Sequence, residues 1–204
     1  MNIVGASGHA KVIIEILKLT GQPIDNIWDD NSSLIEFEGF TVKGNSEMLS
    51  KTKSHVSIIA IGNNRIRKRI AEMVGGDFEV AIHPKSSISP TAYIGKGTVI
   101  MANATVSSCV NLGKHVIINT NASVDHDCKI GDFAHISPQA GIAGGVSIGE
   151  GTHVGIGASI IQGLKIGNWA TIGAGAVVLK DVPDFAVVVG NPARIIKYNH
   201  EFEQ

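Results

Sequence analysis

The chain has 204 residues, of which 44 % are hydrophobic, so it is long and apolar enough to bury a core. Lysine and arginine number 17 against 18 acidic residues, and this balance excludes a broad basic surface for nucleic acid or anionic membrane. We find no apolar run of about 20 residues and no basic leader before an apolar segment, so we expect a cytoplasmic protein without a membrane span or signal peptide.

The first 82 residues have the pattern of a small α/β unit. Short apolar strands are predicted at 2–4, 24–28, 56–61 and 78–82, and helices at 10–20, 45–51 and 65–74. Strands that alternate with helices favour a parallel sheet, which binds ligands at the carboxyl ends of its strands. We therefore expect a Rossmann-like α/β domain over residues 1–82.

Small and polar residues follow three of these strands. A glycine-rich turn before a helix exposes N–H groups that favour an anion, although this turn lacks the third glycine of the dinucleotide fingerprint. The acidic pair after the second strand has two interpretations: its carboxylates bind a nucleotide sugar or base, or they belong to an ordinary surface turn. The candidate nucleotide-sugar residues are Gly5, Ser7, Gly8, His9, Asp29, Asp30, Gly62 and Asn63.

A repeat of six residues dominates the second half. From Ile88 to Val178 every sixth residue is a branched aliphatic, sixteen in succession. This period fits a hexapeptide β-solenoid and neither an isolated helix nor an alternating hairpin. Three units make one triangular coil of 18 residues, so sixteen units predict a little over five coils. We expect the glycine or asparagine that often follows the aliphatic to supply the turn dihedral.

The repeat resembles the left-handed β-helix acyltransferases of the hexapeptide-repeat family, and VVGNPAR near the C-terminus is similar to the segment that closes their helix. The motifs GASGHA, WDD, AIGNN-x-x-RK and SVDHDCKIGDFAHISP together resemble bacterial sugar acetyltransferases of the PglD/NeuD type. The resemblance implies a left-handed parallel β-helix over residues 83–204, a homotrimer, and acetyl-CoA as co-substrate without a metal.

The resemblance also implies site residues. His126 matches the general base and Asp127 the acid that orients it, where relatives often carry Glu; Asp125 competes for that role. A neutral imidazole suits proton removal from an amine, and a neighbouring carboxylate fixes its tautomer. Direct transfer needs no acyl-enzyme, so Cys109 and Cys128 are expected to be packing residues. The implied acetyl-CoA residues are Asn119, His135, Gly155, Gly173, Lys180 and Arg194, of which Asn119 and His135 have solvated turn positions as their alternative.

Several functions fit these residues. The leading hypothesis is acetyl-CoA-dependent N-acetylation of a nucleotide-linked amino sugar, of the UDP-4-amino-4,6-dideoxy type, in glycan or polysaccharide biosynthesis. N-acetylation of GDP-perosamine, O-acetylation of sialic acid or a related sugar, and a non-enzymatic nucleotide-sugar-binding scaffold are the alternatives. The set of candidate nucleotide residues favours N-acetylation, and the intact pair of His126 and Asp127 argues against the scaffold.

Overall fold

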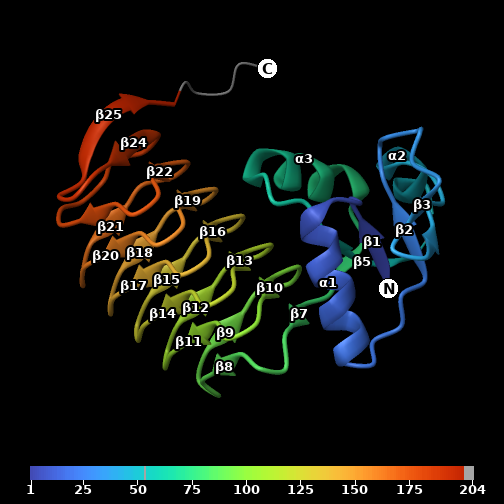
Figure 1. Cartoon of the computed structure of the whole chain (residues 1–204), viewed down its shortest axis with the longest axis horizontal. Helices are drawn as coiled ribbons and strands as arrows, with labels where there is room; N and C mark the ends of the chain where they lie inside the picture. The colour runs from blue at the N-terminus through green and yellow to red at the C-terminus, as the bar shows by residue number, and fades with distance from the viewer. Residues whose placement is uncertain (53, 200–204) are drawn as a thin grey trace.

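The computed structural model describes residues 1–52 and 54–199, and it places an α/β domain beside a β-solenoid (Figure 1). Residues 200–204 of the predicted second domain lie outside the described ranges. The α/β domain has a four-stranded sheet in the order β2-β1-β5-β6, and its paired strands are parallel. The prediction of a small parallel α/β unit is therefore confirmed. Its elements are β1 (Asn2–Val4), α1 (Gly8–Leu19), β2 (Asn26–Trp28), β3 (Glu36–Phe37), β4 (Phe40–Thr41), α2 (Ser46–Ser50), β5 (Val56–Ile59), α3 (Asn64–Val74) and β6 (Asp77–Phe78).

The two domains share apolar packing. One face of α1 buries Ile13 and Leu17, as the helical spacing of the aliphatic residues predicts. The same cluster contains Val99, Met101 and Ile117 of the solenoid, all at most 3 % exposed. The domains are thus joined by a common core rather than by a solvated linker.

The strand predicted at 78–82 is two strands. Asp77–Phe78 extends the α/β sheet, whereas β7 (Ala81–Ile82) pairs with β10 (Val99–Ile100) as the first strand of the solenoid. The sequence of residues 78–82 does not show where the chain changes sheets, because both of its ends have the apolar residues of a strand. The solenoid consequently begins two residues before position 83.

The solenoid is a prism with three faces, each a stack of parallel strands. Residues 18 apart are paired, for example Ile118 with Ile136 and Val154 with Ile172. Face 1 consists of β7, β10 (Val99–Ile100), β13 (Ile117–Ile118), β16 (His135–Ile136), β19 (His153–Val154), β22 (Thr171–Ile172), β24 (Ala186–Val189) and the antiparallel β25 (Arg194–Tyr198). Face 2 consists of β8 (Ser87–Ile88), β11 (Thr105–Val106), β14 (Ser123–Val124), β17 (Gly141–Ile142), β20 (Ser159–Ile160) and β23 (Val177–Val178). Face 3 consists of β9 (Tyr93–Ile94), β12 (Asn111–Leu112), β15 (Lys129–Ile130), β18 (Ser147–Ile148) and β21 (Lys165–Ile166).

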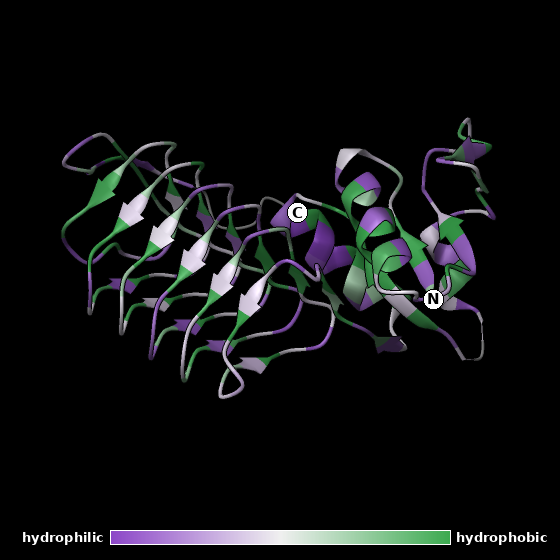
Figure 2. Cartoon of the chain, turned by 60° about the horizontal axis from the view of Figure 1, so that its bottom comes forward, coloured by the Kyte–Doolittle hydropathy of each residue, from purple (hydrophilic) through white to green (hydrophobic). Residues whose placement is uncertain are grey.

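The aliphatic residue of each unit points inward and forms a continuous core. Figure 2 shows hydrophobic residues at the same place in successive coils. The alanines two positions earlier are buried as well, so they fill the corners of the core. The prediction of a parallel β-solenoid is confirmed, but the coil count is wrong. Face 1 has seven parallel strands, because Ile82 and Val188 add units outside the strict aliphatic run.

The turn dihedral does not come from the residue that follows the aliphatic, contrary to the prediction. Positive φ falls three positions after it, at residues such as Asn121 (φ 58°) and Asp127 (φ 59°). The glycines directly after the aliphatic serve a different purpose, because the next coil passes close to them. A Cβ on Gly149 would lie 2.5 Å from the backbone nitrogen of Asn168, so a side chain is sterically excluded there.

Candidate active site

His126 and Asp127 occupy the corner between β14 and β15. The positive φ of Asp127 turns its carboxylate back toward the preceding residue, and Oδ2 lies 2.8 Å from Nδ1 of His126. The carboxylate of Asp125 accepts the backbone N–H of His126 at 2.8 Å, so it shapes the turn and leaves the ring to Asp127. The hydrogen bond to Asp127, assisted by the charge of Asp125, raises the pKa of His126.

Gly144, one coil further on, makes room for this imidazole. A Cβ at Gly144 would lie 2.6 Å from both Cε1 and Nε2 of His126. Gly144 is not among the residues predicted from the sequence, although its spacing of 18 from His126 could have identified it. The ring of His126 therefore needs a glycine beneath it.

Asn119 and His135 lie on face 1 and are hydrogen-bonded. The backbone N–H of Thr120 donates to Oδ1 of Asn119 at 2.8 Å, which orients the amide so that its nitrogen donates to Nε2 of His135 at 3.0 Å. Burial, with the nearby charges of His153 and Arg67, lowers the pKa of His135 to about 3, so this ring is neutral with its proton on Nδ1. In this arrangement Nε2 of His135 accepts from Asn119, and Nδ1–H of His135 is a buried donor without an acceptor within the described ranges.

The pair of His126 and Asp127 does not meet Asn119 and His135 within one chain. The chain passes from face 1 to face 2, turns the corner that holds His126, and continues along face 3 before it returns to face 1. That corner is therefore opposite face 1, against which the α/β domain packs. The predicted catalytic pair and the predicted nucleotide loops are on opposite sides of the same prism.

The remaining residues predicted for acetyl-CoA lie near the later coils. Gly155 and Gly173 follow β19 and β22 at the corner between faces 1 and 2, where close coil packing requires glycine: a Cβ at either would lie 2.7 Å from another atom. Lys180 follows β23 and Arg194 begins β25, and both are exposed. The structure brings these four residues to the end of the prism nearest the C-terminus.

The loops predicted for the nucleotide sugar meet at the carboxyl edge of the α/β sheet. Gly5 has φ 103°, and the carboxylate of Asp29 accepts the backbone N–H of Ala6 at 2.7 Å. Asp30 accepts the backbone N–H of Ser46 at 2.9 Å and its hydroxyl at 2.6 Å. The acidic pair thus holds the neighbouring loops in place, a role the sequence did not reveal.

Two glycines of these loops face open space. A Cβ at Gly8 or at Gly62 would meet no atom within 4 Å, so the fold does not require glycine there. Ser7 precedes α1, and the side chain of Asn63 caps α3 by accepting the N–H of Ile66. Burial, with the charge of Arg67, lowers the pKa of His9 to about 4, and within the described ranges its Nε2 has no hydrogen-bond partner.

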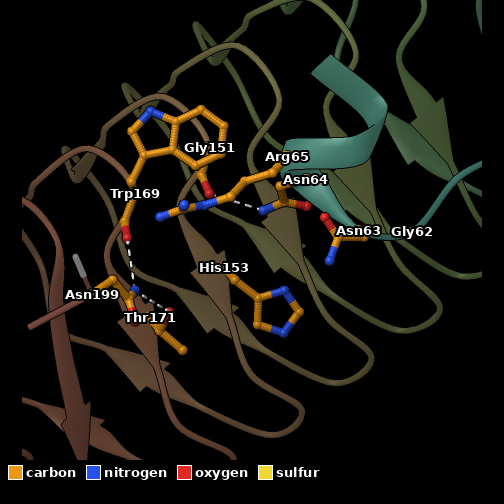
Figure 3. Close-up of a pocket in the computed structure, with 9 residues that line it drawn as sticks. All are labelled: Gly62, Asn63, Asn64, Arg65, Gly151, His153, Trp169, Thr171 and Asn199. Atoms are coloured by element: carbon orange, nitrogen blue, oxygen red, sulfur yellow. Dashed lines mark hydrogen bonds between the residues drawn. The ribbon is translucent and has the colours of Figure 1, made fainter. Parts of the chain in front are cut away.

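A cleft of about 270 Å³ lies between the first turn of α3 and the solenoid (Figure 3). The Arg65 guanidinium extends into it and lies 5.7 Å from the ring centre of Trp169. Only Gly62 and Asn63 of this cleft are among the residues predicted from the sequence, because the others meet only after the domains pack. Its lining residues are Gly62, Asn63, Asn64, Arg65, Gly151, His153, Trp169, Thr171 and Asn199.

Comparisons with known proteins match both halves of the chain. Residues 1–74 match the family model "PglD N-terminal domain", and residues 145–180 match "Bacterial transferase hexapeptide (six repeats)". UDP-N-acetylbacillosamine N-acetyltransferase of Bacillus subtilis is 42 % identical over 108 residues, which cover 49 % of this chain and 50 % of that protein. The match therefore spans about half the length of this curated relative.

Solved structures match nearly the whole chain. PerB of Caulobacter crescentus, in complex with CoA and GDP-perosamine, is 37 % identical with a TM-score of 0.90, and the match covers 96 % of each chain. The acetyltransferase domain of PglB from Neisseria gonorrhoeae, in complex with acetyl coenzyme A, is 40 % identical with a TM-score of 0.88 and covers 96 % of this chain and 98 % of that one. Over residues 1–52 and 54–199 we find no helix long and apolar enough to cross a membrane.

Proposed function

The chain belongs to the PglD-type family of hexapeptide-repeat sugar acetyltransferases, and from this premise we propose that it transfers the acetyl group of acetyl-CoA to the amino group of a nucleotide-linked amino sugar. The observation that carries the proposal is the hydrogen bond of 2.8 Å between Nδ1 of His126 and Asp127, on a chain similar over 96 % of its length to an enzyme solved with CoA and a nucleotide amino sugar. The loops at Gly8 and Gly62 supply open space for the nucleotide.

The proposed chemistry uses His126 as a general base. Because Nδ1–H of His126 donates to Asp127, Nε2 is the atom that takes the proton of the attacking amine. The amine nitrogen forms a bond to the thioester carbon, and the carbon–sulfur bond breaks as the tetrahedral intermediate collapses. The proton then passes from His126 to the leaving thiolate, so acetyl transfer is direct and no acyl-enzyme forms.

The proposed assembly is a homotrimer with shared sites. The corner that holds His126 is opposite face 1 of its own chain, so it meets a nucleotide loop and the pair of Asn119 and His135 only on a neighbouring chain. The antiparallel strand β25 supports this assembly, because it exposes Ile195, Ile196 and Tyr198 at the solenoid edge by 46 %, 59 % and 54 %. Packing of a second prism would cover such a surface.

The nucleotide is the finer part of the proposal. The Bacillus subtilis relative is named for a UDP-linked sugar, and the Caulobacter crescentus structure contains GDP-perosamine. We favour a UDP-linked amino sugar. GDP-perosamine is the second candidate, because the enzyme solved with it matches 96 % of the chain. Either substrate presents a sugar amine to the same base.

The test is thiol release from acetyl-CoA with a panel of UDP-, GDP- and dTDP-linked amino sugars and free sialic acid. Purified wild-type protein is expected to release thiol with one nucleotide amino sugar. His126→Ala should lower kcat by about 10²–10⁴-fold with little change in either KM, because the base acts on the proton rather than on binding. Cys109→Ser serves as control and should keep wild-type activity. Release with sialic acid alone, or undiminished kcat in His126→Ala, would refute the proposal.

A further inference from the structure

A column of backbone carbonyls runs along the corner between faces 3 and 1. It consists of the turn residues His115, Phe133, Gly151 and Trp169, which are 18 residues apart and have φ values of 53–64°. Within residues 1–52 and 54–199, no backbone amide outside helices and strands donates to these four carbonyls. Acceptors of this kind need other partners when they are buried. At this corner each coil therefore presents a carbonyl that accepts from a side-chain donor, at a spacing of about 4.8 Å.

Side chains of α3 and of the C-terminal segment meet this column. Arg67 donates from Nε to the carbonyl of His115 at 2.9 Å and from Nη2 to that of Phe133 at 2.7 Å. Asn64 donates to the carbonyl of Gly151 at 3.0 Å, and Asn199 of the C-terminal segment donates to that of Trp169 at 3.2 Å. Asn64 and Arg67 are three residues apart on α3, a rise of about 4.5 Å, which matches the spacing of the coils. The helix is thus in register with the solenoid.

Arg67 also holds the loop that precedes α3. Nη1 donates to the carbonyls of Ile61 and Gly62, both at 3.0 Å, and Nη2 donates to Oδ1 of Asn64 at 3.0 Å. With the two coil contacts, all five N–H donors of the guanidinium are used. The side chain is 1 % exposed and, among the described residues, forms no ion pair with a carboxylate. One buried cation therefore links Gly62 of the predicted nucleotide site to two coils.

We propose that Arg67 and Asn64 are positioning residues that fix the axial register between the nucleotide loop and the solenoid. Through these contacts the loop at Gly62 lies beside the coils of the solenoid that carry Asn119 and His135. A slip by one coil would move the loop by about 4.8 Å, whereas a misplacement of about 1 Å already impairs catalysis. The catalytic consequence rests on the proposed function, but the register itself does not.

The kinetic test compares Arg67→Met with Arg69→Met, an exposed arginine on the same helix. Arg67→Met should lower kcat about 10–100-fold, while the Kd for acetyl-CoA, measured by calorimetry, should stay within about twofold. Arg67→Lys, which keeps the charge and part of the hydrogen bonding, should recover part of kcat. Arg69→Met should match the wild type. An Arg67→Met enzyme with the kcat of Arg69→Met would overturn the proposal.

A readout independent of activity separates this inference from the proposed function. Calorimetric unfolding of the wild type and Arg69→Met should show one transition, and Arg67→Met should show the α/β domain melting first, with faster amide exchange at Ile61 and Gly62. If no sugar is acetylated by the wild type but Arg67→Met separates the transitions, the register role stands and the proposed function fails. If Arg67→Met does not fold, Asn64→Ala decides: faster exchange at Gly62 supports the proposal, and unchanged exchange overturns it.

Discussion

At the scale of single residues, geometry decides what each titratable group does. Asp127 has a shorter side chain than the glutamate often found at this position in the resembling enzymes, yet its carboxylate reaches His126 at 2.8 Å because the positive φ turns it back. His126 is 61 % exposed and its pKa is raised, whereas His135 is half-buried and neutral. The two histidines therefore suit different tasks, proton transfer for the first and hydrogen-bond placement for the second.

The pH dependence of kcat should follow His126. Because the pKa of His126 is raised, its basic form accumulates only as the pH rises above the ordinary value of 6.5. The pH profile of kcat should therefore have a rising limb in this range. Asp127→Asn removes the main cause of the raised pKa, so its limb should move to lower pH, and kcat should fall less than in His126→Ala. Rates measured from pH 5.5 to 9 check this. A limb that stays in place in Asp127→Asn would contradict it.

Gly144→Ala should impair catalysis without loss of the fold. Its Cβ would lie 2.6 Å from the ring of His126, which must rotate away from its place over the corner. We expect kcat to fall about 10–100-fold with little change in the midpoint of thermal unfolding. Gly141→Ala is the matched control, because its Cβ would meet no atom closer than 3.7 Å and kcat should be unchanged. Equal kcat values for the two variants would disprove the steric role.

At the scale of elements, the loop between β1 and α1 contains one glycine that the backbone requires, Gly5, and one that faces open space, Gly8. Gly5 is structurally required: its φ is 103°, and a Cβ would lie 2.8 Å from Ile61. Gly8 begins α1 with no neighbour within 4 Å of its Cβ position, which leaves the first N–H groups of the helix accessible. Such N–H groups and the helix dipole attract a phosphate.

Gly8→Val should therefore weaken nucleotide-sugar binding and spare the fold. The added side chain would occupy the space above the N-terminus of α1 where a phosphate would lie. We expect the Kd for the nucleotide sugar to rise at least about tenfold, with the Kd for acetyl-CoA and the thermal midpoint nearly unchanged. Calorimetric titration with each ligand measures this. A parallel loss of acetyl-CoA affinity would indicate that the α/β domain is not the separate nucleotide site.

At the scale of the whole molecule, the domain interface contains a buried histidine whose protonation is unfavourable in the folded chain. The ring of His115 stacks on Phe133 at 5.0 Å between centres and meets Phe78 edge-on at 4.5 Å. Burial, with the charge of Arg67, lowers the pKa of His115 to about 4. Protonation of this imidazole therefore lowers the stability of the folded chain, and the same holds for His135.

Acid should loosen the molecule through His115. The unfolded chain binds a proton near pH 6.5 and the folded one only near pH 4, so the stabilisation is complete above pH 6.5 and is lost as pH falls toward 4. His115→Phe, which mimics Phe133 one coil further on, should reduce the loss of unfolding free energy between pH 7 and 5 by about 2 kcal/mol. Urea unfolding at both pH values checks this. An identical loss in both proteins would contradict the assignment.

A shared site predicts complementation between chains that are impaired at different residues. If Gly8 of one chain and His126 of its neighbour serve the same site, mixed trimers of Gly8→Val and His126→Ala contain some sites in which both residues are intact. Random mixing in equal amounts should restore about 25 % of wild-type sites. Co-expression followed by the thiol-release assay, with light scattering to establish the trimer, measures this. No activity above the two separate variants would exclude a site shared in this way.

The sequence by itself determined the solenoid, its register and the alternation of strands and helices in the α/β domain, but it did not reveal the hairpin of β3 and β4. A six-residue aliphatic period suffices because each coil contacts only its neighbours, so residues 18 apart, such as Ile118 and Ile136, pair without further information. The same local pattern placed His126 beside Asp127. It could not fix the coil count, because Ile82 and Val188 continue the stack outside the uninterrupted run.

Only the tertiary structure decided which groups meet across domains and across the prism. Arg67 contacts His115 and Phe133 through a helix that lies 48 and 66 residues earlier in the chain, and such contacts leave no periodic signal. The position of His126 opposite face 1 is likewise a property of the closed coil rather than of the motif. Local patterns specify the units because neighbouring residues interact directly, while the site depends on long-range packing of side chains on surfaces that form only when the chain has folded.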